Sequence, residues 1–433
     1  MKHNECLKQK QNSSSTMSLL ANLRSNEGLL EEILSKGNMH QALDKVIKNK
    51  GAAGVDGMRT EQLKEHLKEE WQNIKTALLS GNYKPSRTRM VEIPKSTGGV
   101  RKLGIPTVLD RLIQQAIMQI LQHYIDGCLS EHSYGFRPGR SAHDAIFKSQ
   151  QHIKEGRKYI IDIDLEKYFD TVNHDKLMSK LARNIKDQRV LDIIRKYLNA
   201  GIMLDGEDGR GVPQGSPLSP LLSNIYLHML DTELNKRGHH FVRYADDCQI
   251  FVKSQKAAER VMNSISKFLK QKLKLKVNQE KSKIGSKCQF LGYEITAKKL
   301  SVSTSSLKKF KYKIRMQTKR TRGIKLIYLI HGLKPLINGW FEYFKYHSDQ
   351  KLFKELDRWI KRRLRVHQFI SLKTGKNRLK EFLKAGLDYD TAYRFAYTFS
   401  GPWKTSAGRA MCSALSSNYL QKLGLPELYR KSN

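Results

Sequence analysis

The sequence predicts an α+β protein in which a domain built on an antiparallel sheet is followed by a mostly helical region. Two apolar runs, Tyr159–Leu165 and Phe241–Val252, are typical of buried strands, and a short acidic turn divides the second run into a hairpin. Beyond residue 304 the apolar positions recur at helical spacing, for example through residues 333–344 and 356–364. Hairpins and helices mixed in one chain favour the α+β class.

The elements on either side of these strands are predicted from periodicity and from turn residues. Residues 1–17 are polar and are expected to form a loose tail, whereas residues 19–50 have helical spacing. The glycine-rich stretch Gly51–Gly57 ends that helical region as a loop. The other elements expected in the sheet domain are a helix over 61–79, a hairpin of Arg87–Pro94 and Val100–Ile105, helices over 109–129 and 257–273, and strands over 273–277 and 290–295.

The net charge indicates a polyanionic partner. Lys and Arg number 79 against 41 Asp and Glu, which gives +38 and self-repulsion in the folded chain. Nucleic acid relieves such repulsion and is the expected partner. No acidic residue occurs from Ile295 to Phe341, and the basic stretches Lys308–Arg315 and Trp359–Arg365 carry interleaved aromatics, which favours phosphate contact over an ordinary solvated face.

The cysteines and the hydropathy of the sequence indicate the cellular compartment. The five cysteines are widely spaced and include no C-x-x-C pair, so neither a disulfide framework nor a zinc site is expected. No apolar run is long enough to span a bilayer, and the N-terminus is too polar for a signal peptide. We therefore expect a cytoplasmic protein with no membrane partner.

Two acidic elements beside apolar strands indicate metal-dependent chemistry. Asp246 and Asp247 form the acidic turn of the predicted hairpin, and Asp162 and Asp164 share one face of the other strand. An ordinary Asp turn or a strand-end helix cap would explain either element alone. Together they suit two Mg²⁺ ions about 4 Å apart, which activate a 3′-hydroxyl and stabilise the leaving pyrophosphate.

Eight motifs follow one another along the chain in a fixed order. They are Ile93–Arg111, Ser133–Gly139, Asp164–Phe169, Val212–Pro220, Tyr244–Asp247, Leu275–Lys283, Phe290–Tyr293 and Ile337–Phe344. This ordered set resembles the reverse transcriptase family, and more narrowly the reverse transcriptases (maturases) encoded by group II introns. The resemblance implies a right-hand polymerase with an N-terminal extension over 1–70, fingers and palm over 71–303, a helical thumb (domain X) over 304–375, and a DNA-binding segment over 376–433.

The resemblance also implies a catalytic centre. Asp164, Asp246 and Asp247 are the catalytic metal ligands by this match, with Asp162 beside them. Phe169 follows Asp164 by five residues, where the family has a sugar gate that rejects a 2′-hydroxyl. A plain core position is the alternative for Phe169.

Substrate contacts are implied in the same way. Lys95 and Arg101 match fingers residues that grip the triphosphate, although a solvated hairpin face is the alternative, and Gln214 matches a residue near the incoming nucleotide and the template. Ser216 stands where many relatives have glycine, which leaves template placement open. The residues assigned to primer or other nucleic-acid contact are Lys281, Leu291, Gly292, Arg315, Lys319 and Arg320.

The expected cofactor is a pair of Mg²⁺ ions, with Mn²⁺ as a substitute. The expected partners are group II intron RNA, an RNA template with a DNA primer, target DNA and deoxynucleotides, for a monomer or homodimer in the bacterial cytoplasm. Many relatives append an endonuclease domain with Cys pairs, whereas this sequence has Cys412 alone near Asn433, so we expect no DNA-cleaving activity, as in compact class C maturases.

Other uses of the same residues stay open at the level of sequence. A domesticated, retron-like or defence-associated reverse transcriptase would keep the same catalytic residues. A splicing cofactor with weak or no polymerase activity would keep the basic helical region, but it would have no need of the three acids. A DNA-templated, primase-like polymerase would differ in template preference.

Overall fold

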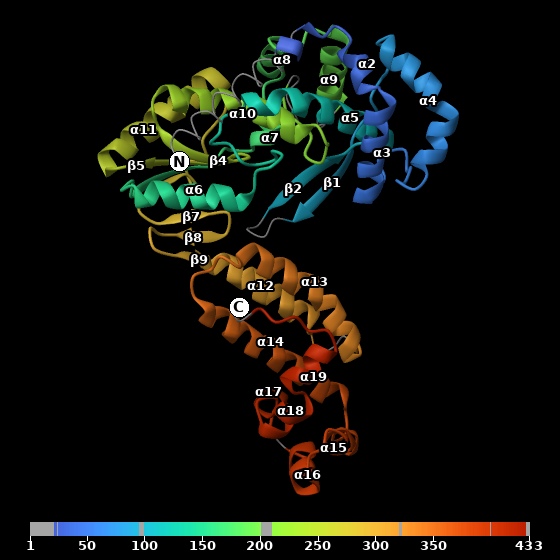
Figure 1. The fold of residues 1–433 in the computed structure, drawn as a ribbon, viewed down its shortest axis with the longest axis vertical. Helices are drawn as coiled ribbons and strands as arrows, with labels where there is room; N and C mark the ends of the chain where they lie inside the picture. The colour runs from blue at the N-terminus through green and yellow to red at the C-terminus, as the bar shows by residue number, and fades with distance from the viewer. Residues whose placement is uncertain are drawn as a thin grey trace, which may run out of the picture. The chain divides into compact units, whose positions relative to one another are not determined.

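The chain forms two compact units, Met1–Ser286 and Lys287–Asn433, each with its own apolar core (Figure 1). Both units combine helices with antiparallel strands, so the predicted α+β class is confirmed. The small sheet after residue 286 belongs with the C-terminal helices, whereas the sequence placed it before a boundary at 303; the functional division within each unit stays a prediction. This computed structural model describes residues 21–23, 25–94, 99–200, 210–319, 323–398 and 400–429.

A four-stranded antiparallel sheet carries the first unit. Its strand order is β4–β5–β3–β6, with β3 at Tyr159–Ile163, β4 at His240–Tyr244, β5 at Asp247–Val252 and β6 at Lys283–Gly285. β3 is paired on both edges, by β5 and by β6, which explains its continuous apolar character. The strand and the hairpin predicted from the sequence are therefore confirmed.

Helices pack around this sheet and supply most of the core (Figure 1). α11 packs against β3, β5 and β6, and α6 packs against β4. The helices of the first unit are α2 (Leu29–Ile33), α3 (Lys36–Asn49), α4 (Leu63–Leu79), α5 (Val108–Ile125), α6 (Ala142–Lys154), α7 (Tyr168–Thr171), α8 (His174–Ala182), α9 (Gln188–Ala200), α10 (Ser219–Lys236) and α11 (Gln255–Phe268).

A separate two-stranded hairpin, β1 (Arg89–Pro94) and β2 (Val100–Ile105), forms as predicted. Most of its side chains are exposed, so the hairpin presents basic groups to solvent. The backbone N–H of Gly104 donates to the carbonyl of Gln214 at 2.9 Å, which ties β2 to the loop before α10. Lys95 and the turn that follows it lie outside the described residues.

The second unit is a three-stranded antiparallel sheet followed by helices. The strands, in the order β7–β8–β9, are Cys288–Phe290, Tyr293–Ile295 and Leu300–Val302. In the described ranges, no helix of either unit combines the length and apolarity that crossing a membrane requires. The helices are α12 (Thr304–Gln317), α13 (Leu326–Phe344), α14 (Gln350–Ser371), α15 (Gly375–Lys384), α16 (Tyr389–Ala396), α17 (Pro402–Thr405), α18 (Arg409–Ala414) and α19 (Ser417–Lys422).

The strand predicted over residues 273–277 is wrong. The helix of α11 continues as a π-helical turn through Leu273, and Lys274 then takes a left-handed φ of +57°. Val277 makes an isolated bridge to Leu165 instead of joining a strand. An apolar residue at every second position is compatible with a helix end followed by an extended segment, so the pattern alone misassigned it.

The strand predicted over residues 290–295 is two strands joined by a tight turn. Phe290 pairs with Tyr293, and the two residues between them have positive φ, +49° for Leu291 and +84° for Gly292. A leucine in this backbone region is unusual, so the apolar pattern concealed the turn.

A buried histidine gives the first unit a pH-dependent stability. His152 on α6 is 2% exposed, its ring lies 5.2 Å from that of Phe251, and neither ring nitrogen has a hydrogen-bond partner among the described atoms. Burial, reinforced by Lys148 and His240, lowers the pKa of His152 from its ordinary 6.5 to about 4. Between pH 6.5 and about pH 4, His152 is therefore mostly protonated in the unfolded chain and mostly neutral in the folded chain.

We expect the free energy of unfolding to fall as the pH is lowered from 6.5 to 4. The substitution His152→Phe should remove part of that loss. Urea unfolding at pH 7 and pH 5 measures both proteins. The wild type loses stability at pH 5 through this group, whereas a phenylalanine of similar shape has no proton to gain. Equal losses in the two proteins would show that His152 does not contribute.

Candidate active site

The strand register brings the predicted acids to one end of the sheet. β3 runs antiparallel to β5 with Ile163 opposite Cys248, so the next pair of positions is Asp164 and Asp247. Tyr244 pairs with Asp247 across the β4–β5 hairpin, which leaves Ala245 and Asp246 as its two-residue turn. Asp164 and the adjacent pair Asp246 and Asp247, which are far from it in sequence, are thus brought to the same end of the sheet.

The hairpin turn is held in a strained conformation by a buried cation. Ala245 has φ +58°, a region that favours glycine, and its carbonyl accepts a 2.8 Å hydrogen bond from Arg243 Nη1. Arg243 is fully buried and forms a double ion pair with the equally buried Asp231, at 2.6 and 2.7 Å. The sequence analysis missed this pair, because no local pattern links α10 to β4.

The acids of this turn are arranged as a repelling group. Burial, together with the negative charge of Asp164, raises the pKa of Asp246. Burial and the charges of Asp246, Asp162 and Asp164 raise the pKa of Asp247 to about 6. Because Asp247 is exposed to solvent as a residue, we attribute its raised pKa mainly to the neighbouring negative charges.

The loop before β6 fixes the backbone of Asp164. The N–H of Asp164 donates to Ser282 Oγ at 3.0 Å, and its carbonyl accepts from the N–H of Asn278 at 2.9 Å. Lys281, assigned to primer contact from the sequence, is an exposed residue of this loop. Asp162 pairs in register with Lys283 and Gln249 within the sheet.

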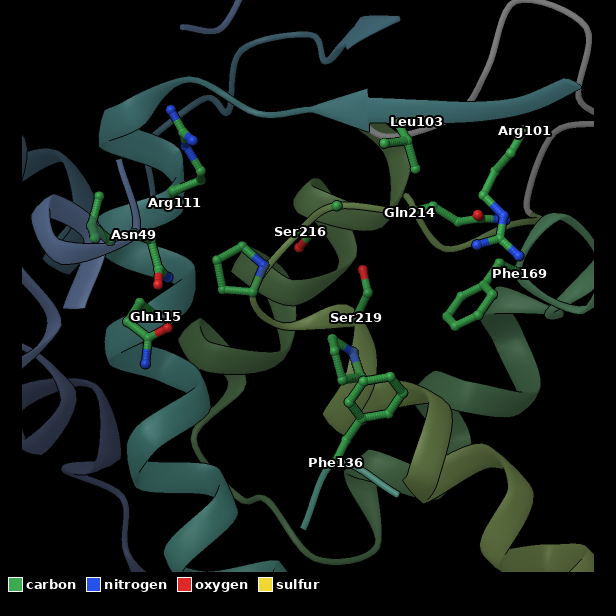
Figure 2. A pocket seen from close by; sticks show the side chains of 14 residues that line it. Asn49, Arg101, Leu103, Arg111, Gln115, Phe136, Phe169, Gln214, Ser216 and Ser219 are labelled. Carbon is green, nitrogen blue, oxygen red and sulfur yellow. The ribbon is translucent and has the colours of Figure 1, made fainter. Parts of the chain in front are cut away.

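Three predicted substrate residues line one pocket. Arg101 from β2, Phe169 from α7 and Gln214 from the loop before α10 border a cavity of about 450 Å³, and Figure 2 shows them at one side of it. The N–H of Val212 donates to the carbonyl of Phe169 at 2.6 Å, which joins the Gln214 loop to α7. The half-buried Phe169 ring lines the pocket and also packs against the apolar core of the first unit.

The serine that departs from the family pattern fits the pocket wall. Ser216 is buried, and its hydroxyl contacts the side-chain oxygen of Gln114 on α5. The neighbouring Gly215 has φ +117° and lies against the carbonyl of Gly104, so glycine is required at that position. Ser216 itself lies in ordinary backbone and needs no glycine.

The pocket also contains residues that the sequence analysis did not single out. Asn49, Arg111, Gln115 and Phe136 line it together with the three residues above (Figure 2). They come from α3, α5 and the loop before α6, which are separated by tens of residues. Only tertiary packing brings them together, although Arg111 and Phe136 do fall inside recognised motifs.

In the second unit, the turn assigned to the primer grip is firmly packed. The carbonyl of Leu291 accepts from Tyr343 Oη at 2.8 Å, and the carbonyl of Gly292 accepts from the N–H of Ser303 at 2.9 Å. A Cβ at Gly292 would lie 2.8 Å from Ser306 Oγ and 3.4 Å from the Phe344 ring. Glycine is therefore needed for both its φ and its close packing.

The basic face of α12 is also present. Arg315 is exposed and lies 5.8 Å from the ring of Trp359, which Arg363 approaches at 5.7 Å. Lys319 follows α12 as an exposed residue, whereas Arg320 lies outside the described residues. Trp340 stacks on Phe310 at 4.3 Å and packs against the core of the second unit.

Comparison with known proteins identifies the family of this chain. Residues 93–295 match the family model for reverse transcriptase (RNA-dependent DNA polymerase), and residues 307–385 match that for the group II intron, maturase-specific domain. Protein YkfC of Escherichia coli is 35% identical, over 55% of this chain and 74% of YkfC. The group II intron-encoded protein LtrA of Lactococcus lactis is 28% identical, over 60% of this chain and 55% of LtrA.

A solved telomerase from Candida albicans superimposes with a TM-score of 0.42 and 13% identity over 77% of this chain and 68% of its own. The family matches and the site define a reverse transcriptase, an RNA-directed DNA polymerase. Within that class, the chain belongs to the group II intron-encoded reverse transcriptases with a maturase-specific domain. Such polymerases depend on divalent metal ions.

Proposed function

We propose that this protein copies RNA into DNA at the pocket beside the β4–β5 turn, and that it binds the RNA of a group II intron. The observation that carries the proposal is the strand register, which sets Asp164 opposite Asp247 and beside Asp246. A nucleotide-sized cavity lined by Arg101 and Phe169 supports the same assignment.

The donor set suits hard cations. In the described ranges, no three His, Cys, Asp or Glu side chains already form a metal-holding group. Besides burial, the charge of Asp164 nevertheless raises the pKa of Asp246, and the charges of Asp246 and Asp164 raise that of Asp247; divalent cations would remove that repulsion. We propose that Asp164, Asp246 and Asp247 hold two Mg²⁺ ions, with Mn²⁺ as a substitute, because all their ligand atoms are oxygens. Bound there, the ions would supply charge stabilisation for nucleotidyl transfer.

The pocket, whose lining does not include the three aspartates, is proposed to position the nucleotide. Arg101 is exposed on β2, and its guanidinium suits a triphosphate that enters beneath the hairpin. Gln214 presents its side-chain amide to the pocket. Its backbone carbonyl accepts a hydrogen bond from Gly104 of β2, so the hairpin and the loop that carries Gln214 are linked. The primer 3′-oxygen would attack the α-phosphorus, the bond to the β-phosphate would break to release pyrophosphate, and the proton of the attacking hydroxyl would pass to solvent water.

The second unit is proposed to bind RNA and target DNA. Its maturase-specific match covers most of α12 and all of α13, α14 and α15, and the exposed cations Arg315 and Lys319 suit phosphate. Intron RNA, the template–primer duplex and target DNA are all polyanions, so salt will weaken their binding steeply. LtrA is itself named a group II intron-encoded protein, which supports the intron partner.

Primer extension tests the proposal. The full chain, an RNA template, a DNA primer, Mg²⁺ and four deoxynucleotides should give full-length DNA. A DNA template in parallel tests the primase-like alternative. Tight RNA binding without any synthesis by the wild type would overturn the polymerase and favour a splicing cofactor.

Phe169→Ala should weaken the rejection of ribonucleotides. Removing the ring leaves room for a 2′-hydroxyl, and a single steric contact of this size is worth about 10- to 100-fold in selectivity. The ratio of kcat/KM for dCTP over CTP, measured by single-nucleotide incorporation, should fall by that factor, while kcat/KM for dCTP changes less. An unchanged ratio would assign Phe169 to packing alone.

A further inference from the structure

An exposed phenylalanine at the pocket has no part in the assignments above. Phe136, in the loop before α6, lines the same cavity as Arg101 and Phe169. Its side chain is 51% exposed, and its backbone has φ +58°, a region that L-residues other than Asn and Asp rarely occupy. A large apolar ring is thus kept in solvent on a strained backbone, and such strain is concentrated at functional sites.

The loop that carries this ring is fastened to the catalytic turn. A Cβ at Gly135 would lie 2.4 Å from the backbone nitrogen of Ala245, so these two backbones are in direct contact. Asn224 Nδ2 donates to the carbonyl of Gly135 at 2.8 Å, and the N–H of Tyr134 donates to the carbonyl of Arg243 at 2.9 Å. Phe136 is therefore positioned with respect to Asp246 by the backbone itself.

The other side of the loop is anchored as well. The buried Arg137 donates to Asp126 and to the carbonyls of Ser130 and Ser133, with its shortest bond at 2.6 Å. Gln122 Nε2 donates to the carbonyl of Phe136 at 3.2 Å. With the neighbours on both sides fixed, the Phe136 ring is left as the exposed part of a rigid loop.

The pocket has two ends with different chemistry. Arg101 and Phe169, proposed to face triphosphate and sugar, lie together at the right of Figure 2, and Phe136 lies separately from them, below Ser219 in this view. A nucleotide whose phosphates and sugar occupy the first side must direct its base away from it. The second side therefore receives a planar aromatic group, for which an exposed aromatic ring is a suitable partner.

We propose that Phe136 is a stacking platform for a nucleobase of the base pair being formed in the pocket. The inference rests on the proposed polymerase function. The base belongs either to the incoming deoxynucleotide or to the template, and the two share the same stacking chemistry. Phe136 acts as a positioning residue, because a ring that fixes the base also fixes the α-phosphorus.

Single-nucleotide incorporation on an RNA template tests the proposal with Phe136→Ala, Phe136→Leu and Phe136→Tyr. Stacking on one base predicts a loss of kcat/KM of about 10-fold or more for the alanine variant. The leucine variant should show a similar loss, because it keeps apolar bulk but no ring face, and the tyrosine variant should stay near wild type. The matched control is Phe147→Ala, a 39% exposed phenylalanine on α6 that does not line the pocket.

A template with an abasic site at the copied position separates the two sources of the base. If the template base stacks on Phe136, wild type and Phe136→Ala become equal on that template. If the incoming base stacks, the variant keeps its deficit there and the deficit appears in KM for the deoxynucleotide.

Wild-type rates for Phe136→Ala on normal template, with synthesis intact, would overturn this inference alone. A leucine variant as active as wild type would also overturn it, since bulk without a ring would then suffice. Absence of synthesis by the wild type would instead overturn the proposed function.

Discussion

Asp246→Asn should lower the rate of DNA synthesis by about 10³-fold or more, the largest effect expected for any single substitution in this chain. The carboxylate lies in the turn between β4 and β5, beside Asp164 and Asp247. An amide of the same shape keeps the fold but removes one negative charge from the proposed cation site, and such charge stabilisation is worth several kcal/mol in a metal-assisted transfer.

Primer extension under single-turnover conditions measures the rate, and fluorescence anisotropy with the same template–primer measures binding. Binding should change little, because the basic surface is untouched. Asp175→Asn is the matched control: it removes an exposed acid of α8 that pairs with Arg195 at 2.9 Å, outside the pocket. Synthesis by Asp246→Asn within tenfold of wild type would remove this residue from the catalytic centre.

Arg243→Met should destabilise the first unit by about 3–5 kcal/mol. The substitution leaves Asp231 fully buried without its partner, and an uncompensated buried charge carries a cost of that size. The Ala245 carbonyl also loses its donor, so the strained turn that carries Asp246 is no longer fixed. We therefore expect activity to fall even at temperatures at which the variant remains folded.

Urea unfolding followed by circular dichroism measures the loss of stability, and the double variant Arg243→Met with Asp231→Leu measures the coupling. The double variant should recover stability relative to the single variant, because both charges are gone. Recovered stability without recovered activity would show that the cation also positions the turn. Arg195→Met, which breaks an exposed pair, should cost no more than about 1 kcal/mol. Losses of equal size in Arg243→Met and Arg195→Met would contradict the assignment.

The sequence determined the class of this protein because the residues proposed for its chemistry lie in short, local sequence patterns. Asp246 lies in a hairpin turn that adjacent apolar runs define, Asp247 begins the strand after it, and Asp164 directly follows a buried strand. Arg101 and Gln214 belong to motifs whose order along the chain carries the resemblance. Where a segment had no local signal for a turn, as at Leu291, the apolar pattern predicted one strand in place of two.

Tertiary structure alone decided which of these groups meet. The register between β3 and β5 sets Asp164 opposite Asp247, and a shift of one residue would turn it to the other face of the sheet. The buried Arg243–Asp231 pair and the contact of Gly135 with Ala245 arise from segments far apart in sequence. The backbone of Phe136 has a positive φ that local preference disfavours, so the packing around this residue must hold it there. Local patterns identify the reacting groups, whereas long-range packing fixes their geometry.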